Sequence, residues 1–292
     1  MAPRWGIALA VASIMLAFAG NSVITRYLVV GSIASPILLT IVRFTSGLAT
    51  LLFLRALFPS AFPGTFRARR DLVGGFFLGA YAFSISLGYQ YISAAAGTLV
   101  FYAFVILTMA LYGYLRDRET PTLRSGAGQV LALVGVVIIT FGGIREVTFL
   151  GVVLMAATGS SWGLYSVYGR SAGDARSYTL HTFLVVGAFC LLLVPIFELG
   201  PPGVLSIQTT PNGLGLALFM GMISTALSYV LWHLTLRRIT ASQGGIVQLT
   251  VPVLASGMGI VLLGEHLTLS LALGGACVLA GIYLNRVNPG SS

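Results

Sequence analysis

The polar residues of this sequence that could bind a small molecule recur at helical spacing inside long apolar stretches. In one stretch Gly244, Gln248 and Pro252 lie four residues apart, and Ala255 and Gly259 continue the same helical face. Proline has no N–H and clashes with the carbonyl four residues earlier, so Pro252 should free the Gln248 carbonyl beside its carboxamide. Lining a cavity, these groups could bind a polar ligand, while Pro252 and Gly244 let the helix kink. The alternative is that the small residues only pack against another helix.

Aromatic and hydroxyl side chains supply candidate walls for such a cavity. Tyr81 and Ser84 share one face of a predicted helix, although periodicity does not exclude the opposite face, which carries Ser86. Tyr81 is favoured because it lies at mid-depth. The other candidates for substrate binding are Asn21, Tyr102, Trp162 and Tyr165. Packing in the core is the alternative role for each aromatic side chain.

Arg43 lies eight residues into a predicted helix, about 12 Å along the axis from its end. Leaving an arginine in lipid costs roughly 3 kcal/mol. Arg43 should therefore face protein or a cavity, or extend toward the membrane surface. Two partners are open for its guanidinium, a substrate carboxylate or helix-end carbonyls.

The seven acidic residues all fall at the ends of apolar stretches or in turns. Proton-driven pumps usually carry a carboxylate or histidine buried in the membrane. His181 is expected near a cytoplasmic helix end and His233 near an extracellular one. This distribution favours a facilitator or a loosely coupled exporter.

An enzymatic role has one weak signal, the G-x-S-x-G pattern at residues 159–163. The reactive form of that motif is a sharp turn between a strand and a helix, whereas this copy lies inside an apolar helix and also reads as a G-x-x-x-G packing motif. Cys190 and Cys277 lie singly in apolar stretches, without disulfide or metal spacing. We therefore predict no catalytic residue, metal or cofactor, with an intramembrane hydrolase as a remote alternative.

Composition indicates where these residues must lie. Of the 292 residues, 57% are hydrophobic and 8% are charged, whereas soluble domains carry about 25% charged residues. The sequence therefore predicts an integral membrane protein in contact with the lipid bilayer. A membrane-crossing helix needs about 20 mainly apolar residues. Windows of that length predict ten helices, at 5–28, 35–57, 72–91, 94–115, 124–142, 148–169, 178–197, 212–236, 243–263 and 267–286.

Arginine supplies all 16 of the basic residues. With ten crossings and a cytoplasmic N-terminus, 13 arginines fall on the cytoplasmic side, Arg26 and Arg145 fall outside, and Arg43 lies within a helix. An excess of arginine in cytoplasmic loops is the usual orientation signal. The formal charge of +9 therefore predicts topology, with both termini cytoplasmic, and does not indicate nucleic-acid binding.

The two halves of the sequence repeat each other at an offset of 146 residues. The matching positions are Ala95 and Ala241, Glu119 and Glu265, Gly128 and Gly274, and Gly135 and Gly281. Each half, 1–145 and 146–292, holds five predicted helices, so the second half must insert upside down. Inverted repeats place a substrate site near the bilayer midplane. We expect Tyr102 and Gln248, which correspond in the repeat, to meet there.

The sequence I-V-R-F at 41–44, the sequence G-E-H-L-T at 264–268 and the glycine-bearing last helix resemble the drug/metabolite transporter superfamily. Within it the chain resembles EamA-type ten-helix transporters, and most of all bacterial amino-acid exporters of the YddG type. The resemblance implies an all-α integral membrane fold of ten transmembrane helices in two inverted five-helix repeats. The first half departs from the pattern, with R-D-R-E-T at 116–120 and Ile106 where the second half has Pro252.

Taken with the residues, the resemblance implies export of small metabolites by alternating access, with aromatic or other large neutral amino acids as substrates. Export of lipophilic drugs or other metabolites is the alternative, because an aromatic lining with few charges also suits lipophilic cations. The expected partners are a small-molecule substrate and the lipid bilayer, and a monomer is the working expectation for the oligomeric state.

Overall fold

The computed structural model describes residues 4–116, 118, 123–141, 147–198, 209–238, 241–248 and 250–284. Its first half contains α1 (Arg4–Val30), α2 (Pro36–Leu57), the short η1 (Pro59–Ala61), α3 (Ala68–Gly88), α4 (Ala94–Arg116) and α5 (Leu123–Phe141). Its second half contains α6 (Phe149–Arg170), α7 (Ala175–Glu198), α8 (Pro211–Phe219), η2 (Met220–Leu227), α9 (Ser228–Leu236), α10 (Ala241–Val247), α11 (Thr250–Leu263) and α12 (Leu269–Leu284).

Every predicted apolar stretch overlaps helix in the structure, and two of the stretches are built from more than one segment. Within the described residues, seven helices are long and apolar enough to cross a bilayer, and further apolar helices at Gly126–Gly135, Thr250–Leu263 and Leu269–Gly281 are shorter. The described residues thus form an all-helical protein that passes the membrane several times. The glutamate of the first repeat copy, Glu119, lies outside them.

Short polar turns start several of the helices. The side chains of Ser35, Thr148 and Thr210 each accept a hydrogen bond from the backbone N–H three residues later, at the first turns of α2, α6 and α8. Pro36 and Pro211 follow two of these caps, at a position where the missing N–H costs no helical bond. Local sequence therefore sets where these helices begin.

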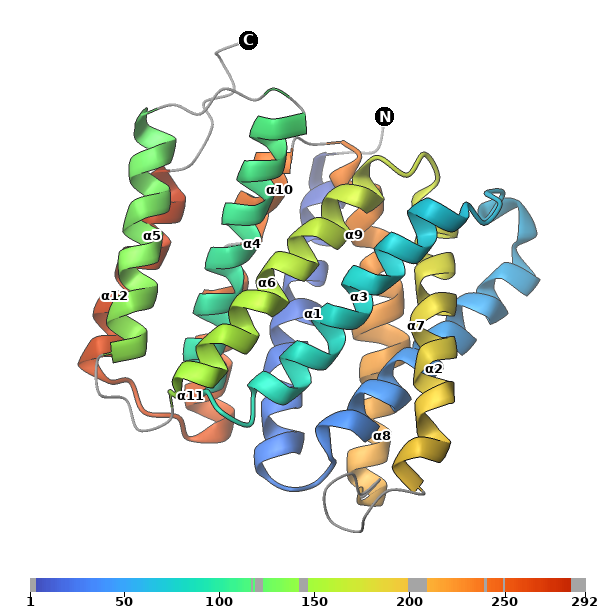
Figure 1. The fold of residues 1–292 in the computed structure, drawn as a ribbon, viewed down its shortest axis with the longest axis horizontal. Helices are drawn as coiled ribbons and strands as arrows, with labels where there is room; N and C mark the ends of the chain where they lie inside the picture. Colours follow the sequence, from blue (N-terminus) through green and yellow to red (C-terminus); the bar gives the residue numbers. More distant parts are fainter. Residues whose placement is uncertain are drawn as a thin grey trace.

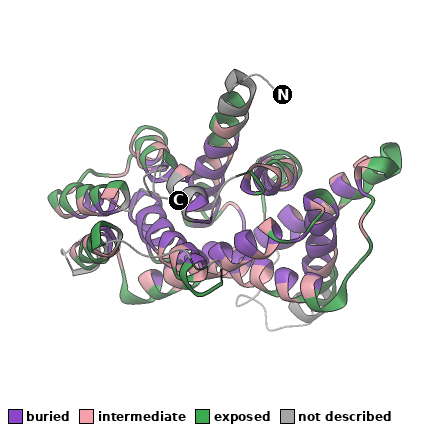
Figure 2. Cartoon of the chain, turned by 90° about the horizontal axis from the view of Figure 1, so that it is seen from above, coloured by how far each residue is buried: buried purple, intermediate pink, exposed green. Residues whose placement is uncertain are grey.

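The helices form a bundle with a crossed centre (Figure 1). α5 and α12 pack on each other along one edge, whereas α2 and α7 lie toward the opposite edge. α1, α3, α4 and α6 cross between them. Buried residues gather on the faces that these central helices turn inward, and exposed residues cover the outside (Figure 2).

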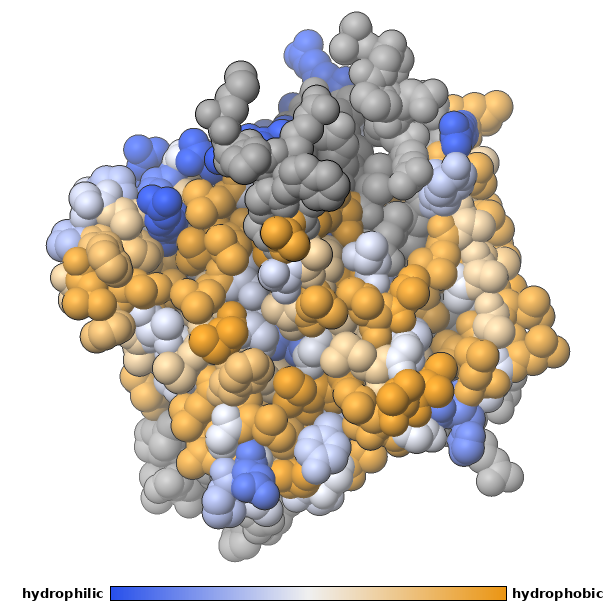
Figure 3. All heavy atoms as spheres, turned by 180° about the vertical axis from the view of Figure 1, so that it is seen from behind, coloured by the Kyte–Doolittle hydropathy of each residue, from blue (hydrophilic) through white to orange (hydrophobic). Residues whose placement is uncertain are grey.

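The outer surface suits a bilayer. Large hydrophobic side chains such as Phe53, Phe76 and Leu192 are exposed, and hydrophobic residues cover the middle of the face in Figure 3, with hydrophilic residues near its two ends. An apolar band between polar ends is what a membrane-spanning helical bundle presents to lipid.

Two spans depart from a regular α-helix. In the span α8–η2–α9 the middle segment, Met220–Leu227, is wound as a π-helix, a form that is rare and frequent at functional sites. The next span is broken, because α10 ends at Val247, Gln248 lies in a turn and α11 begins at Thr250. Discontinuous helices of this kind occur at the binding sites of transporters.

Candidate functional site

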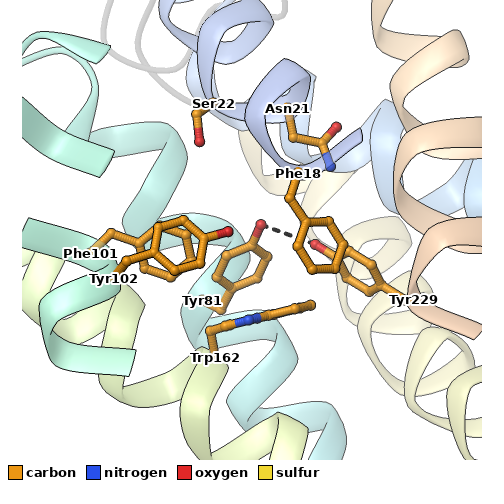
Figure 4. Close-up of a pocket in the computed structure, with 8 residues that line it drawn as sticks. All are labelled: Phe18, Asn21, Ser22, Tyr81, Phe101, Tyr102, Trp162 and Tyr229. Atoms are coloured by element: carbon orange, nitrogen blue, oxygen red, sulfur yellow. Dashed lines mark hydrogen bonds between the residues drawn. The ribbon is translucent and has the colours of Figure 1, made fainter. Parts of the chain in front are cut away.

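A small cavity lies at the crossing of the central helices (Figure 4). Its walls come from α1, α3, α4, α6 and α9, and consist of Phe18, Asn21, Ser22, Tyr81, Phe101, Tyr102, Trp162 and Tyr229. The free space in it, about 10 Å³, is at most enough for one water molecule. The structure therefore shows this region closed around its own side chains.

Aromatic rings provide most of the wall. Trp162 lies at the centre, with its ring centroid 4.7 Å from that of Tyr229, 5.0 Å from that of Tyr81 and 5.4 Å from that of Phe18. The Phe18 and Trp162 rings meet edge to face, the arrangement that aromatic quadrupoles favour. A ligand would have to separate these rings to enter, and an apolar ligand group would then replace ring–ring contacts with its own.

Arg43 lies immediately behind two of the tyrosines and is 1% exposed. Its Nη2 donates hydrogen bonds to the hydroxyl oxygens of Tyr81 (3.1 Å) and Tyr229 (2.8 Å). Its Nε donates to Thr225 Oγ1 at 2.7 Å. The sequence left a substrate carboxylate or helix-end carbonyls as partners, and the expectation of carbonyls is wrong because the partners in the structure are three hydroxyls.

Asn21 is held by the π-helical segment. Its Nδ2 donates to the Ser224 carbonyl (2.8 Å), and its Oδ1 accepts from the Ser224 hydroxyl (2.6 Å). Thr225, the next residue, binds Arg43, and Tyr229 lies one turn further along. Through the π-helical segment, Ser224 and Thr225, which are adjacent in the sequence, thus bind two different polar side chains of the site, Asn21 and Arg43.

Gln248 does not line the cavity, but it binds Trp162, which does. Its Oε1 accepts the Trp162 indole N–H (2.8 Å), and its Nε2 donates to the Gly244 carbonyl (3.2 Å). The expected free carbonyl at Gln248 is not present, because it accepts a hydrogen bond from the N–H of Val251 at 3.1 Å. The kink predicted from Pro252 is present as the break between α10 and α11, but the turn satisfies the carbonyl locally.

No hydrogen bond among the described residues joins Tyr102 and Gln248, and only Tyr102 belongs to the cavity wall. Tyr102 lines the cavity directly, whereas Gln248 reaches it through Trp162. Tyr165 packs against Trp162, with a distance of 5.6 Å between the ring centroids, and its hydroxyl lies 3.3 Å from Thr182 Oγ1. Ser84 is half-buried and outside the cavity wall, while Ser86, on the other face of α3, shares a 2.8 Å hydrogen bond with Thr40.

One acid that the sequence places at a helix end, Asp71, is nevertheless buried by the rest of the protein. It belongs to the first turn of α3 but is fully buried. Its carboxylate accepts hydrogen bonds from the Arg67 N–H (2.8 Å) and Arg70 Nε (2.5 Å), and lies 3.0 Å from His181 Nδ1. The described residues therefore include a buried carboxylate, which lies at the end of α3 and not at the middle of a span.

The two histidines lie at the same end of the bundle, contrary to the expectation from the sequence. His233 Nδ1 is 3.0 Å from the hydroxyl of Thr179, which is two residues before His181. The reason is the direction of the chain, since α9 ends at Leu236 beside Arg237 and Arg238, whereas α7 begins at Ala175. The end of one helix and the start of the other therefore meet.

Two contacts lie between Tyr102 and the N-terminal end of α4. The Tyr89 hydroxyl lies 3.1 Å from Thr98 Oγ1, one turn beyond Tyr102. One further turn on, the Glu265 carboxylate accepts hydrogen bonds from the N–H groups of Ala94 (2.6 Å) and Ala95 (3.1 Å). We call this contact of Glu265 with the start of α4 the Glu265 latch.

Sequence reasoning missed three aromatic residues of the cavity wall, Phe18, Phe101 and Tyr229. Phe18 could have been found, because it corresponds to Trp162 when the first and sixth predicted helices are superposed at an offset of 144. Phe101 and Tyr229 gave no such signal, since an aromatic residue in an apolar helix is as typical of packing as of a binding site.

Comparison of the chain with known proteins finds a matching family and several relatives. The EamA-like transporter family matches residues 149–287. An uncharacterized protein of Pseudomonas aeruginosa is 36% identical over 273 residues, which are 92% of this chain and 91% of that protein. A Salmonella typhimurium protein named probable amino-acid metabolite efflux pump is 27% identical, over 77% of this chain and 81% of its own length.

A solved structure with 21% sequence identity superposes with a TM-score of 0.68 and covers 96% of this chain and 95% of the other. This match shows a shared fold. The family, the relative named as an efflux pump and the helical membrane architecture agree on a small-molecule transporter. The chain belongs to the EamA-like transporter family.

Proposed function

We propose that the protein exports amino acids with aromatic or other large neutral side chains across a bacterial inner membrane by alternating access. The observation that carries this proposal is the cavity itself, in which rings surround a few hydroxyl and amide groups. Such a lining offers apolar contact to a large side chain and hydrogen bonds to a polar backbone group. The name of the Salmonella relative points the same way.

We further propose that ten helices cross the membrane as two inverted repeats, 1–145 and 146–292. The glycines that match in the two halves support this. A Cβ on Gly135 would collide with the Gly274 carbonyl, and a Cβ on Gly281 with the Gly128 carbonyl. Shifting the first pair by the repeat offset of 146 gives the second, as expected for contacts related by a two-fold axis. The contact between Phe18 and Trp162, which also correspond, fits the same axis.

The proposed topology predicts which loops face outward. A cysteine at Ser32, after α1, should react with an impermeant maleimide added to intact cells, and a cysteine at Ser171, after α6, should not. Both positions are exposed, so a permeant maleimide should label both and serves as the control. Labelling of position 171 from outside would exclude a cytoplasmic N-terminus with this number of crossings.

The Glu265 latch supports closure at one end of the cavity. Its carboxylate is held close to the start of α4, and Arg26 Nε lies 3.8 Å away, with its Nη1 donating to the Tyr89 carbonyl. A Cβ on Gly259 would lie 2.6 Å from Glu265 Oε2, so a side chain there would displace the carboxylate from this position. The first half of the sequence carries the same spacing in Gly113 and Glu119.

Removing the latch should make the cavity more accessible from outside. Replacing a capping side chain with alanine costs about 0.5–2 kcal/mol, so Glu265→Ala should raise outside labelling of a cysteine at Ser22 by about 2- to 30-fold. Glu265→Gln keeps one amide oxygen as acceptor and should leave downhill flux within about an order of magnitude. Labelling is measured in a background without Cys190 and Cys277. An unchanged labelling rate in Glu265→Ala would contradict the proposed closure.

The second candidate substrate class is lipophilic drugs, which the same rings could bind. Growth of an export-deficient host on single toxic amino acids, or on single lipophilic cations, distinguishes the two. The proposal requires that expression of the protein relieves toxicity of aromatic amino acids and that purified protein in liposomes moves them. Protection against lipophilic cations alone would replace the proposed substrate class with the alternative.

A further inference from the structure

Arg43 is a buried positive charge without a described counter-ion. Its three hydrogen-bond partners, Thr225, Tyr81 and Tyr229, are neutral hydroxyls, and no carboxylate of the described residues forms an ion pair with it. The guanidinium also lies against the rings of Phe44 and Tyr81, at 5.3 and 5.7 Å from their centroids. A buried charge is costly unless it is paired. An anion bound near Arg43 would therefore be attracted by a positive charge that no carboxylate of the described residues pairs with.

The hydroxyl protons of this network show where an anion would bind. Tyr229 accepts a hydrogen bond from Arg43 and donates its own proton to Tyr81, at 3.0 Å (Figure 4). Tyr81 accepts from both Arg43 and Tyr229. A phenol has one proton to donate, and that of Tyr81 has no acceptor among the described residues.

Tyr81 is also the member of the network that can present this proton to a ligand. Its side chain lines the cavity together with Tyr102 and Trp162 (Figure 4), whereas Arg43 lies behind it. Two donors on the Tyr81 oxygen, one of them a cation, polarise its O–H bond and make it a stronger donor. Hydrogen bonds of this kind to a carboxylate are roughly twice as strong as those between neutral groups.

We propose that the Tyr81 hydroxyl, backed by Arg43, binds the carboxylate of the substrate, and that the transported compounds carry a carboxylate beside a large apolar group. Tyr81 is the contacting residue, and Arg43 and Tyr229 position and polarise it. The inference rests on the proposed cavity, but it is independent of whether the substrate has an amino group. It also disfavours lipophilic cations, because the buried guanidinium would repel them.

The test uses two pairs of probes that differ only at the carboxylate, phenylalanine with phenylalaninamide, and hydrocinnamate with hydrocinnamamide. Equilibrium binding to the purified full-length protein is measured for all four. A hydrogen bond to a charged group corresponds to about a 10- to 100-fold change in affinity. The parent protein should therefore bind the acid of at least one pair about 10- to 100-fold more tightly than its amide.

The variant Tyr81→Phe keeps the ring and removes the proposed donor, so it should bring the acid-to-amide ratio close to one. Tyr168→Phe is the matched control, because Tyr168 is a partly buried tyrosine of α6 outside the cavity wall, and it should keep the parent ratio. Tyr229→Phe removes the hydroxyl that donates to Tyr81 and should give an intermediate acid-to-amide ratio. Thermal unfolding shows whether each variant is folded, and the comparison of probes on the parent protein does not depend on any variant.

The outcomes separate this inference from the proposed function. Equal affinities for acid and amide in the parent, or a parent-like ratio in Tyr81→Phe, would overturn the inference even if phenylalanine is transported. Binding of hydrocinnamate but not of phenylalanine, with a ratio that depends on Tyr81, would support the inference and overturn amino-acid export. Binding of none of the four probes would overturn both.

Discussion

Gly221→Ala is expected to force α2 away from the π-helical segment η2 and to lower both stability and substrate affinity. A Cβ at this position would collide with the Ser46 hydroxyl and with the backbone carbonyl of Arg43. The serine side chain can rotate, but the carbonyl moves only if α2 itself moves. Inserting a methyl group into such a contact costs about 1–3 kcal/mol.

The effect should reach the site because the same helix contact holds the arginine. Thr225, one turn after Gly221, accepts the hydrogen bond from Arg43 Nε at 2.7 Å. A shift of η2 from α2 would lengthen this bond and move Tyr229, which binds the same guanidinium. Gly221→Ala should therefore unfold at lower temperature than the parent in detergent and bind substrate more weakly.

Gly215 provides the matched control. It lies in α8, in the same membrane span, and a Cβ there would meet nothing within 4 Å. Because alanine favours helix over glycine by about 1 kcal/mol, Gly215→Ala should be as stable as the parent or slightly more so. Equal unfolding temperatures for the two alanine variants would show that α2 and η2 are not in tight contact.

Gln248→Leu is expected to weaken substrate binding about 5- to 150-fold, because it leaves the indole N–H of Trp162 without an acceptor. Both side chains are buried, Gln248 at 0% and Trp162 at 2% exposure. An unsatisfied buried donor costs about 1–3 kcal/mol, and Trp162 can recover this by turning out of the cavity wall. The ring contacts with Phe18, Tyr81 and Tyr229 would then be lost.

A double-mutant cycle separates this positioning role from direct contact with substrate. Trp162→Phe removes the donor, so adding Gln248→Leu to it should cost much less affinity than Gln248→Leu costs alone. Replacing both partners of a buried hydrogen bond by apolar groups can be nearly neutral. If the two substitutions were additive in the measured binding affinity, Gln248 would contact the substrate independently of Trp162, and the site would extend to the break between α10 and α11.

The sequence determined the helices and the surroundings in which they lie. Predicted and observed bounds agree within a few residues, as for 94–115 against Ala94–Arg116 and for 148–169 against Phe149–Arg170. The reason is local, because the length of an uninterrupted apolar run fixes a membrane helix, and polar turns and prolines mark its ends. The break near Pro252 was predictable for the same reason, since a missing N–H acts on the turn that contains it.

Only the tertiary structure decided which side chains meet. Gln248 and Tyr102 correspond in the repeat, yet the hydrogen-bond donor to the Gln248 side chain is Trp162 of a third helix. Asp71 reads as a helix-end acid, yet α7 brings His181 over it and buries it. The π-helical turn that brings Thr225 to Arg43 has no signal in the sequence. Spacing along a helix defines a face, but the neighbour of that face depends on helix crossings and rotations, which residues far apart in the chain set together.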